Sequence, residues 1–347
     1  MAGLFVDYLA RRLPLVERAL ADSAGAPLTS EGVAGDLARY LYDPLTRFTA
    51  SGGKRVRPVL ALLGAEAVGG APEDALSCAV AVELFQSAAL VHDDIADEGE
   101  LRRGEPCLYR TEGTGLAINA GDLALTRVFE VILEDGRLDA DRKALVLSEV
   151  ARMERHTLEG QALDLGWVRD GRWDVTPDDY AYMVRSKTAW YTVASPLVLG
   201  ALAAGAAREA AEDLVRVGIP AGLAFQIQDD LLNLTGDAEA QGKDFRSDVT
   251  EGKRTLAVVW ALAHLGPEER DELVGLLDAH VTDARDLERA VELIGRGGGL
   301  DRCRELARRH TDEATGAARA LAQEGRITVE ARDLLCSMAD FFVERAS

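Results

Sequence analysis

Cysteine and histidine are scarce in this chain of 347 residues, which contains four cysteines and five histidines. The cysteines lie far apart in the sequence, and none forms a Cys-x-x-Cys pair. This usage indicates buried, reduced thiols in a cytoplasmic protein. A zinc site is not expected because no histidine is spaced with a cysteine. A carboxylate-bridged di-iron bundle is excluded, since the chain has no Glu-x-x-His. The four cysteines are Cys78, Cys107, Cys303 and Cys336.

Positive charge is also scarce. The chain has 39 Lys and Arg against 59 Asp and Glu, which gives a net charge of −20 and a pI near 4.7. Because phosphate backbones are bound by basic surfaces, no nucleic-acid partner is expected. The same charge disfavours binding to anionic membrane surfaces.

Strand-forming patterns are nearly absent, because alternating runs of Val, Ile and Thr hardly occur. Apolar residues recur instead at i, i+3, i+4 and i+7, and Ala and Leu dominate, which predicts helices throughout. No polar, Pro-rich linker divides the chain, so residues 1–347 are expected to form one all-α domain. Clusters of Gly, Pro and Asp separate the expected helices. These are residues 4–22, 31–49, 55–69, 73–98, 115–135, 141–165, 177–203, 208–235, 254–265, 269–278, 284–296, 299–323 and 328–345.

One uncharged run, Thr188–Ala207, has the length of a membrane span. It contains Pro196, Gly200 and Gly205 together with many alanines, which favours a buried helix pair in a large helical protein. Membrane insertion is the alternative. We expect no membrane span.

Two distant segments share one design. "LFQSAALVHDDIAD" (84–97) and "LAFQIQDDLLN" (223–233) both run an apolar helix, with a Gln, into Asp-Asp-x-x-Asp or Asp-Asp-x-x-Asn. Asp-Asp pairs at helix ends are also common on solvated surfaces. Two such clusters, each after an apolar helix, favour a site built between the helices.

The spacing of the acidic residues suits a magnesium site. Residues four apart on a helix differ in direction by about 40°. Asp93 and Asp97 therefore point the same way, and Asp229 and Asn233 repeat that arrangement. Mg²⁺ takes one or two carboxylates together with waters and substrate phosphates. The repulsion among the aspartates is relieved if cations and a diphosphate fill the gap.

Basic groups gather at a few places in this acidic chain. Each group alone is typical of a solvated face or of a salt bridge. Together with two aspartate clusters, they indicate a site for diphosphates, which arginine binds with a fork of N–H donors and lysine as a point charge. The groups are Lys54 and Arg57 in "GGKRVRP", Arg102 and Arg103 in "RRG", Lys187 with Thr188 in "RSKTAWY", and Lys243 and Lys253 in "GKDFRSDVTEGKRT".

The ordered set of motifs resembles the trans-isoprenyl diphosphate synthases, also called the polyprenyl synthetase family. The resemblance covers residues 30–345, and its first aspartate region is most similar to farnesyl and geranylgeranyl diphosphate synthases. It implies an isoprenoid synthase-type helical bundle with a deep apolar cavity, and a homodimer. The motifs are "GGKRVRP", "DDIADEGELRRG", "GQALDL", "KTAWY", "FQIQDDLLN" and "GKDFRSDVTEGKRT".

The resemblance also implies roles for the polar residues. Asp93, Asp97 and Asp229 would hold Mg²⁺, three ions in each site, and Asn233 departs from the Asp that many members have. The allylic diphosphate would be bound by Arg102, Lys187 and Lys243. Isopentenyl diphosphate would be bound by Lys54, Arg57, Gln86 and Arg103.

Five further residues would support the reaction. Thr188 and Gln226 would lie beside the reacting carbons, and Lys253 would belong to a closing loop. Gln161 and Asp164 would orient Lys187 and metal-bound water. The implied reaction is a Mg²⁺-dependent, head-to-tail condensation that gives a linear all-trans prenyl diphosphate.

Product length is expected to depend on the helix that leads to Asp93. Ala88 and Ala89 lie five and four residues before that aspartate, where bulky aromatics block chain growth in the family. Two alanines leave room, and Phe85 would form the floor. A product of C20 or slightly longer is therefore expected, with geranylgeranyl diphosphate favoured. The alternative is that both alanines only allow close helix packing.

Two other functions fit the sequence less well. A class I terpene cyclase has Ser or Thr and Glu in its second metal motif, which this chain lacks at Asn233 and Asp237. A cyclase also has no use for an isopentenyl site. A non-catalytic subunit of a two-component prenyl synthase usually loses its aspartates or its basic ligands, and this chain keeps them.

Overall fold

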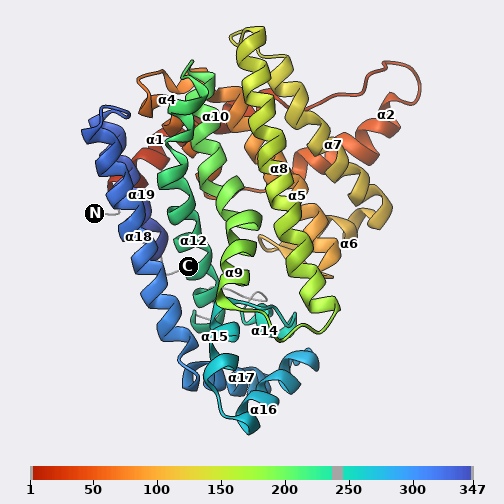
Figure 1. Ribbon diagram of the computed structural model, residues 1–347. Helices are drawn as coiled ribbons and strands as arrows, with labels where there is room; N and C mark the ends of the chain where they lie inside the picture. Colours follow the sequence, from red (N-terminus) through yellow and green to blue (C-terminus); the bar gives the residue numbers. More distant parts are fainter. Residues whose placement is uncertain (1–2, 237–244, 345–347) are drawn as a thin grey trace.

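The computed structural model describes residues 3–236 and 245–344, which form a bundle of helices with one very short two-stranded ladder (Figure 1). The expected all-α fold class is confirmed. The first half of the chain contains α1 (Gly3–Asp22), α2 (Ala34–Leu37), η1 (Ala38–Tyr42), α3 (Asp43–Ala50), α4 (Val56–Ala67), η2 (Pro72–Ala75), α5 (Leu76–Ala96), β1 (Leu101–Arg102), β2 (Glu105–Pro106), α6 (Leu108–Glu112), α7 (Thr114–Leu133) and α8 (Ala140–Arg169).

The second half continues with helices of similar length. It contains α9 (Pro177–Val184), η3 (Arg185–Ala194), α10 (Ser195–Ala203), α11 (Arg208–Glu212), α12 (Val215–Thr235), α14 (Ser247–Thr250), α15 (Leu256–His264), α16 (Pro267–Asp278), α17 (Ala284–Arg296), α18 (Gly299–Gln323) and α19 (Val329–Glu344).

Local sequence signals account for several helix ends. Asp139 accepts a backbone hydrogen bond at the start of α8. Thr176 and Asp179 form a capping box at the start of α9. Such caps satisfy N–H groups that have no partner inside the helix. Helix α17 begins after the cap residue Asp283, and α18 begins after Gly298, whose φ is +76°. Both helices therefore have the bounds that the sequence predicts.

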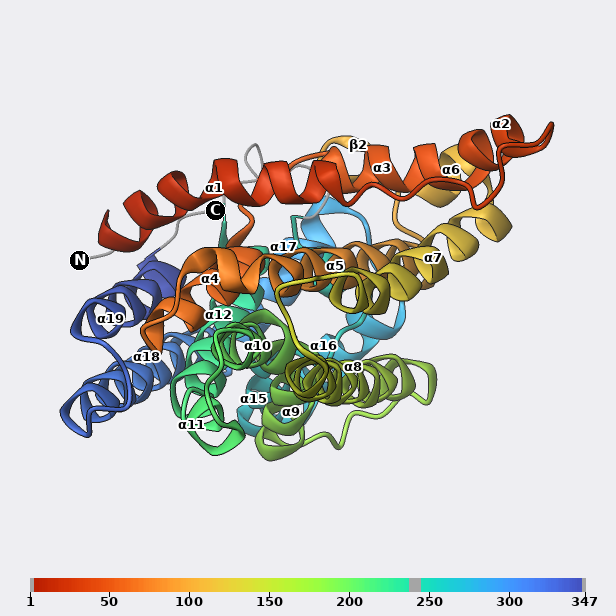
Figure 2. The same ribbon diagram turned by 90° about the horizontal axis from the view of Figure 1, so that it is seen from above.

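The apolar interior has two main parts. The larger one is built on α1, α4, α5, α10 and α19. The smaller one is built on α9 and on α15, α16 and α17, which lie towards the lower tip of Figure 1. Helices α12 and α18 contribute to both parts. Seen from above, α1 and α3 run across one side of the bundle, over α5 (Figure 2).

Glycine allows α4 and α10 to pack with their backbones in contact. A side chain at Gly64 would meet the carbonyl oxygen of Leu197 at 2.1 Å, and one at Gly200 would meet that of Ala61 at 1.8 Å. Because the two approaches are reciprocal, neither glycine can be replaced without separating the helices. This close packing holds α10 directly against α4.

Two expected helices contain a π-helical segment. The helix expected at 177–203 is continuous but consists of α9, η3 and α10, and the one expected at 31–49 consists of α2, η1 and α3. In a π-helix the backbone bonds span one more residue, and such segments occur often at functional sites. Segment η3 carries Lys187 and Thr188, which the sequence predicts in the site.

A few small elements were not expected. Strands β1 and β2 form a hairpin in which Leu101 pairs with Pro106 and Arg102 with Glu105. The short helices α6 and α14 were also missed. All four cysteines are buried free thiols, as expected.

Only one helical stretch in the described ranges, Pro72–Ala96, is long and apolar enough to cross a membrane. Of its apolar window of 18 residues, 78% is buried inside the protein. The uncharged run Thr188–Ala207 does not pass this test, and it consists of parts of η3 and α10 with the turn that follows them.

Candidate active site

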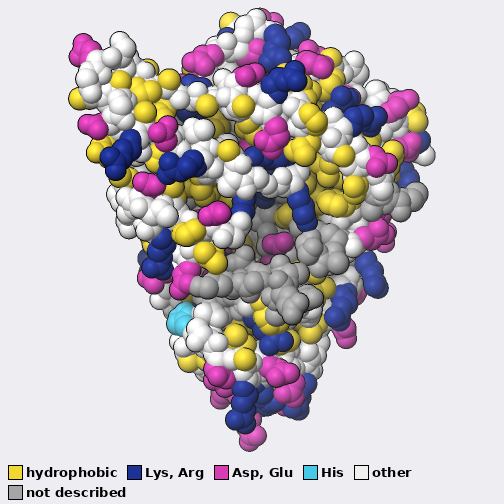
Figure 3. Space-filling view, turned by 180° about the vertical axis from the view of Figure 1, so that it is seen from behind, with side chains coloured by type: hydrophobic (Ala, Val, Ile, Leu, Met, Phe, Trp, Pro, Cys, Tyr) yellow, Lys and Arg dark blue, Asp and Glu magenta, His cyan; other side chains and the backbone are white. Residues whose placement is uncertain are grey.

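A cleft lies between α5, α9, η3 and α12, and residues 247–255 border it. It encloses about 1100 Å³, part of which is open to solvent. On the face shown in Figure 3 the surface is hollowed near its centre, and acidic and basic side chains gather there. Seven carboxylates and four cationic side chains line the cleft: Asp93, Asp97, Asp164, Asp229, Asp230, Asp248 and Glu251, with Arg102, Lys187, Lys253 and Arg254.

Asp93 joins two walls of the cleft. The side chain of Gln161 on α8 donates a hydrogen bond of 2.6 Å to Asp93 Oδ1 on α5. Burial and the neighbouring Asp97 raise the pKa of Asp93, while Lys187 and Lys253 oppose the shift. The partner of Asp93 in this hydrogen bond is therefore a neutral amide, so the bond does not neutralise the carboxylate.

Two lysines lie among the carboxylates. Lys187 Nζ is 2.6 Å from Asp164 Oδ2. Burial alone would lower the pKa of Lys187, but Asp164 and Asp93 outweigh it, so that pKa is raised. Lys253 lies 3.5 Å from Asp97 and also pairs with Glu251. The acidic neighbours again outweigh burial and raise the pKa of Lys253, so both lysines are charged at neutral pH.

A hydrogen-bonded chain runs along the opposite wall. Thr188 Oγ1 donates to Gln226 Oε1 at 3.0 Å, and Gln226 Nε2 donates to Asp230 Oδ1 at 2.7 Å. The Tyr180 hydroxyl donates to the other oxygen of Asp230 at 2.6 Å. Asp230 is buried and Asp229 is exposed in the cleft. The two adjacent aspartates therefore differ in role. Asp230 orients Gln226, whereas Asp229 faces the open space of the cleft.

Asn233 has a structural role at the end of α12. Its Oδ1 accepts a hydrogen bond from the backbone N–H of Asp248 at 3.2 Å, and its Nδ2 donates to Ser247 Oγ at 3.1 Å. An amide can donate and accept at once, whereas a carboxylate only accepts. This gives a physical reason for Asn at the position where many relatives of the motif have Asp.

Of the residues predicted to bind isopentenyl diphosphate, Arg57 lies beside η3. Arg57 donates to the Tyr191 hydroxyl at 3.0 Å and to Thr192 Oγ1 at 3.1 Å, and its guanidinium lies over the Tyr191 ring. Arg103 Nη1 donates to Ser51 Oγ at 3.2 Å, next to the loop that carries Lys54. Gln86 is buried on α5.

Arg102 is fixed by a residue that the sequence reasoning missed. Its Nε and Nη2 atoms both donate to Asp94 Oδ1, at 2.9 and 2.5 Å. Asp94 is buried and pairs with Arg102 on the protein side, while Arg102 itself lines the cleft. Tyr180, Tyr191 and Asp230 were missed as well. For two of these residues there was one hint in the sequence. Asp94 and Asp230 are the second aspartates of the two acidic clusters.

The three predicted chain-length residues point in different directions. Ala88 is fully buried and packs against Leu45 and Ala124, between α5, α3 and α7. Ala89 is half-buried and lies one turn before Asp93 on the same face of α5. Phe85 is buried, and its ring meets that of Tyr191 edge to face at 5.7 Å. Lys243, the remaining predicted residue, lies outside the described residues.

The lining of the cleft suits divalent cations. Its seven carboxylates exceed its four cationic side chains, and oxygen is the ligand that Mg²⁺ prefers. Within residues 3–236 and 245–344, no three His, Cys, Asp or Glu side chains are close enough to enclose a metal ion. An ion bound there needs further oxygens from water or from a substrate phosphate, which is the usual manner of Mg²⁺.

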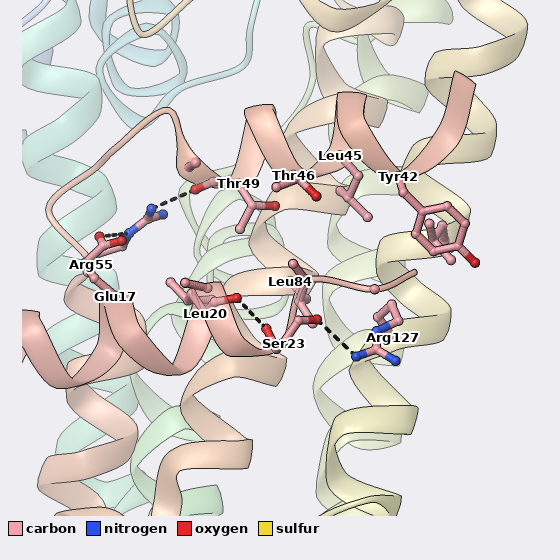
Figure 4. A pocket seen from close by; sticks show the side chains of 15 residues that line it. Glu17, Leu20, Ser23, Tyr42, Leu45, Thr46, Thr49, Arg55, Leu84 and Arg127 are labelled. Atoms are coloured by element: carbon pink, nitrogen blue, oxygen red, sulfur yellow. Dashed lines mark hydrogen bonds and ion pairs between the residues drawn. The ribbon is translucent and has the colours of Figure 1, made fainter. Parts of the chain in front are cut away.

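A second cavity lies on the other side of α5, between α1, α3, α5 and α7 (Figure 4). It encloses about 780 Å³ and is mainly apolar. Leu84, which lines it, is nine residues before Asp93 and so faces about half a rotation away from the cleft. None of the predicted site residues that the structure describes lines this cavity, but Arg55 does.

Comparison with known proteins identifies the family. The sequence model of the polyprenyl synthetase family matches residues 38–294. The chain is 37% identical over 295 residues to a short chain isoprenyl diphosphate synthase of Methanothermobacter thermautotrophicus, covering 85% of this chain and 87% of the relative. It is 36% identical over 324 residues to a geranylfarnesyl diphosphate synthase of Natronomonas pharaonis, covering 89% of each.

A solved structure agrees over nearly the whole chain. The crystal structure of geranylgeranyl pyrophosphate synthetase from Pyrococcus horikoshii matches with a TM-score of 0.85 and 31% identity, covering 99% of this chain and 98% of that one. The helical fold and the polar cleft thus define a prenyltransferase. The chain belongs to the polyprenyl synthetase family. Members of this family use Mg²⁺ in catalysis.

Proposed function

We propose that the protein condenses isopentenyl diphosphate head-to-tail with an allylic diphosphate and releases a linear all-trans prenyl diphosphate. One observation carries the proposal: carboxylates on α5 and α12 line a single cleft together with two charged lysines, beside a separate group of cations. The names of the relatives support the same reaction.

The allylic diphosphate is assigned to the polar cleft. Lys187 and Arg102 would bind its oxygens, because both line the cleft and keep their charge beside buried carboxylates. Lys253, which lines the cleft, would add charge, and the same role is proposed for Lys243. Asp93, Asp97 and Asp229 would hold three Mg²⁺ ions, which stabilise the negative charge that develops on the leaving diphosphate.

Isopentenyl diphosphate is assigned to Lys54, Arg57, Gln86 and Arg103. Arg57 Nε is buried and has no hydrogen-bond partner in the described part of the chain, which suits a site that an anionic ligand completes. Tyr191 and Thr192 hold the other end of this guanidinium, so its orientation is fixed before the substrate arrives.

Ionisation of the allylic substrate leaves a delocalised carbocation that water must not reach. Thr188 and Gln226 would turn their oxygens towards it, since the chain of hydrogen bonds to Asp230 and Tyr180 fixes both side chains. Leu90, Met183 and Val184 supply apolar surface at the same cleft. No covalent intermediate is required, and the released diphosphate would take the proton that restores an allylic product.

The product is proposed to be geranylgeranyl diphosphate or a slightly longer homologue. Ala89 on the Asp93 face of α5 leaves room for chain growth, and the relatives' names include geranylgeranyl and geranylfarnesyl synthases. The whole chain would act as one catalytic domain, in a cytoplasmic homodimer. Four buried free thiols agree with a reducing compartment.

The direct test compares the protein with two variants that lose one carboxylate on either side of the cleft, Asp93→Asn and Asp229→Asn. With Mg²⁺, isopentenyl diphosphate and an allylic diphosphate, the unaltered protein should form a longer prenyl diphosphate, and EDTA should abolish the reaction. Each variant should lose at least about a hundredfold in kcat. A cyclic hydrocarbon, or turnover without isopentenyl diphosphate, would refute the proposal and favour a terpene cyclase.

A further inference from the structure

Arg55 is a buried arginine in the "GGKRVRP" motif that the predicted roles do not use. Its side chain is 1% exposed. Nε donates to Glu17 of α1 at 2.7 Å, Nη1 donates to Glu83 of α5 at 2.5 Å, and Nη2 donates to the carbonyl oxygen of Thr49 in α3 at 2.7 Å. Figure 4 shows this guanidinium between α1 and α3, at one end of the second cavity. One side chain thus joins three helices.

The backbone at Arg55 is held in an unfavourable conformation. Its φ is +47° and its ψ is +35°, in the left-handed region that non-glycine residues rarely adopt. Gly52 and Gly53 before it also have positive φ, at +91° and +131°. A left-handed residue persists where its surroundings over-determine it. Here three hydrogen bonds fix Arg55, and so they also fix the backbone between Lys54 and Arg57.

Glu83 is the buried carboxylate that pairs with Arg55. It is 4% exposed and lies one turn before Gln86 on α5. Burial lowers the pKa of Arg103, and the positive charges of Arg55, Arg102 and Arg57 lower it further, whereas Glu83 raises it. Glu83 therefore acts on the same cation group that is assigned to isopentenyl diphosphate. Without a partner, its buried carboxylate would repel the diphosphate.

We infer that Arg55 is a positioning residue of the isopentenyl diphosphate site, which shields Glu83 from the substrate and fixes the turn between Lys54 and Arg57, at the start of α4. The inference rests on the proposed function. Arg55 touches no substrate, because its side chain is buried and each of its three nitrogens donates to one protein group, Glu17, Glu83 or Thr49. Its effect is carried by charge and by the shape of the loop.

The test is a double-variant cycle of Arg55→Met and Glu83→Gln with steady-state kinetics. Arg55→Met leaves Glu83 bare, so the KM for isopentenyl diphosphate should rise at least about tenfold. The KM for the allylic substrate should change less than about twofold, since that site lies on other residues. Glu83→Gln alone should not raise the KM for isopentenyl diphosphate. Adding it to Arg55→Met should lower that KM at least about threefold from its value in Arg55→Met, because the buried charge is gone while the backbone at residue 55 stays unfixed.

Arg137→Met is the matched control. Arg137 holds the buried carboxylate of Asp135 through two N–H groups at 2.9 and 2.8 Å, away from the cleft. Its loss should lower the melting temperature without changing either KM. The inference is overturned if Arg55→Met leaves the KM for isopentenyl diphosphate unchanged, or if Glu83→Gln fails to rescue it. If the unaltered protein forms no elongated product, the proposed function itself fails, which is a separate outcome.

Discussion

Gln161 on α8 donates a hydrogen bond of 2.6 Å to Asp93 on α5, at the edge of the cleft. The amide orients the carboxylate without neutralising it, so Asp93 stays available to a cation. Gln161 also lies one turn from Asp164, which holds Lys187. One face of α8 thus orients both an acidic and a basic group of the proposed allylic site.

Removing this amide should weaken the metal-dependent step. Partners that orient a metal ligand are typically worth a factor of about 10 to 100 in affinity or activity. Gln161→Leu should therefore lower kcat at least about tenfold and raise the Mg²⁺ concentration needed for half-maximal rate. Gln323→Leu, at an exposed position, is the control and should change neither. A normal Mg²⁺ titration for Gln161→Leu would show that Asp93 needs no such partner.

The contact between α8 and η3 predicts a sharp difference between two glycines of one helix. A side chain at Gly160 would lie 2.2 Å from the backbone nitrogen of Lys187. A side chain at Gly166 would have no atom within 4 Å of it. Gly160→Ala should displace η3 and lower stability by about 2 kcal/mol or more, with loss of activity. Gly166→Ala should raise stability by up to about 1 kcal/mol, because alanine favours helix.

Denaturant unfolding and an elongation assay on both glycine variants check this. Equal behaviour of the two variants would contradict the close packing of η3 against α8.

The two alanines before Asp93 should respond differently to Phe. Ala89 faces the proposed path of the product, so Ala89→Phe should shorten the product to C15 or less with little change in stability. Ala88 is packed against Leu45 and Ala124. Ala88→Phe should therefore overpack α5 against its neighbours and cost about 1–3 kcal/mol of stability. Product masses and unfolding curves separate the two effects. An unchanged product from Ala89→Phe would refute its proposed role.

Glu154 on α8 predicts a pH dependence of stability. Burial alone raises the pKa of Glu154 from 4.5 to about 7, and its Oε1 has no hydrogen-bond partner in the described structure. Between these two values the folded protein keeps a proton that the unfolded chain has lost, so stability falls as the pH rises. At pH 8, Glu154→Gln should be more stable by about 1–2 kcal/mol, after allowance for partial exposure.

The gap between Glu154→Gln and the unaltered protein should vanish by pH 4, where both states hold the proton. Urea unfolding at several pH values measures it. Glu288→Gln, at an exposed position on α17, should show no such pH-dependent gap. A constant difference across pH would mean that Glu154 is not titrating in this range.

Local signals predicted the helices well where a cap or a glycine marks the ends. The bounds of α17 and α18 follow from Asp283 and Gly298, which act within one turn of the chain. The π-helical segment η3 could not be predicted, because its shape depends on packing against α8 and α12. There, side chains at Gly160, Gly218 or Gly222 would collide with the backbone of η3.

The site was predictable to the extent that its residues lie in motifs with helical spacing. Asp93 and Asp97 share a face because four residues nearly complete a turn. Arg55 was passed over within "GGKRVRP", because sequence alone does not tell which cation of a cluster turns inward. Its partners Glu17 and Glu83 are 38 and 28 residues away. Asn233 was noted in the sequence only as a departure from the Asp of many members, because its contacts to Ser247 and Asp248 arise only in the folded chain.

The central claim is that this cleft elongates prenyl chains. The most direct measurement is mass spectrometry of the products formed by the purified protein with Mg²⁺, isopentenyl diphosphate and C5, C10 or C15 allylic diphosphates in turn. The account predicts a linear prenyl diphosphate of C20 or slightly more from each primer that is accepted. A final product of C15 would keep the reaction but contradict the open path beside Ala89. Absence of any elongated diphosphate, with every primer, would contradict the account as a whole.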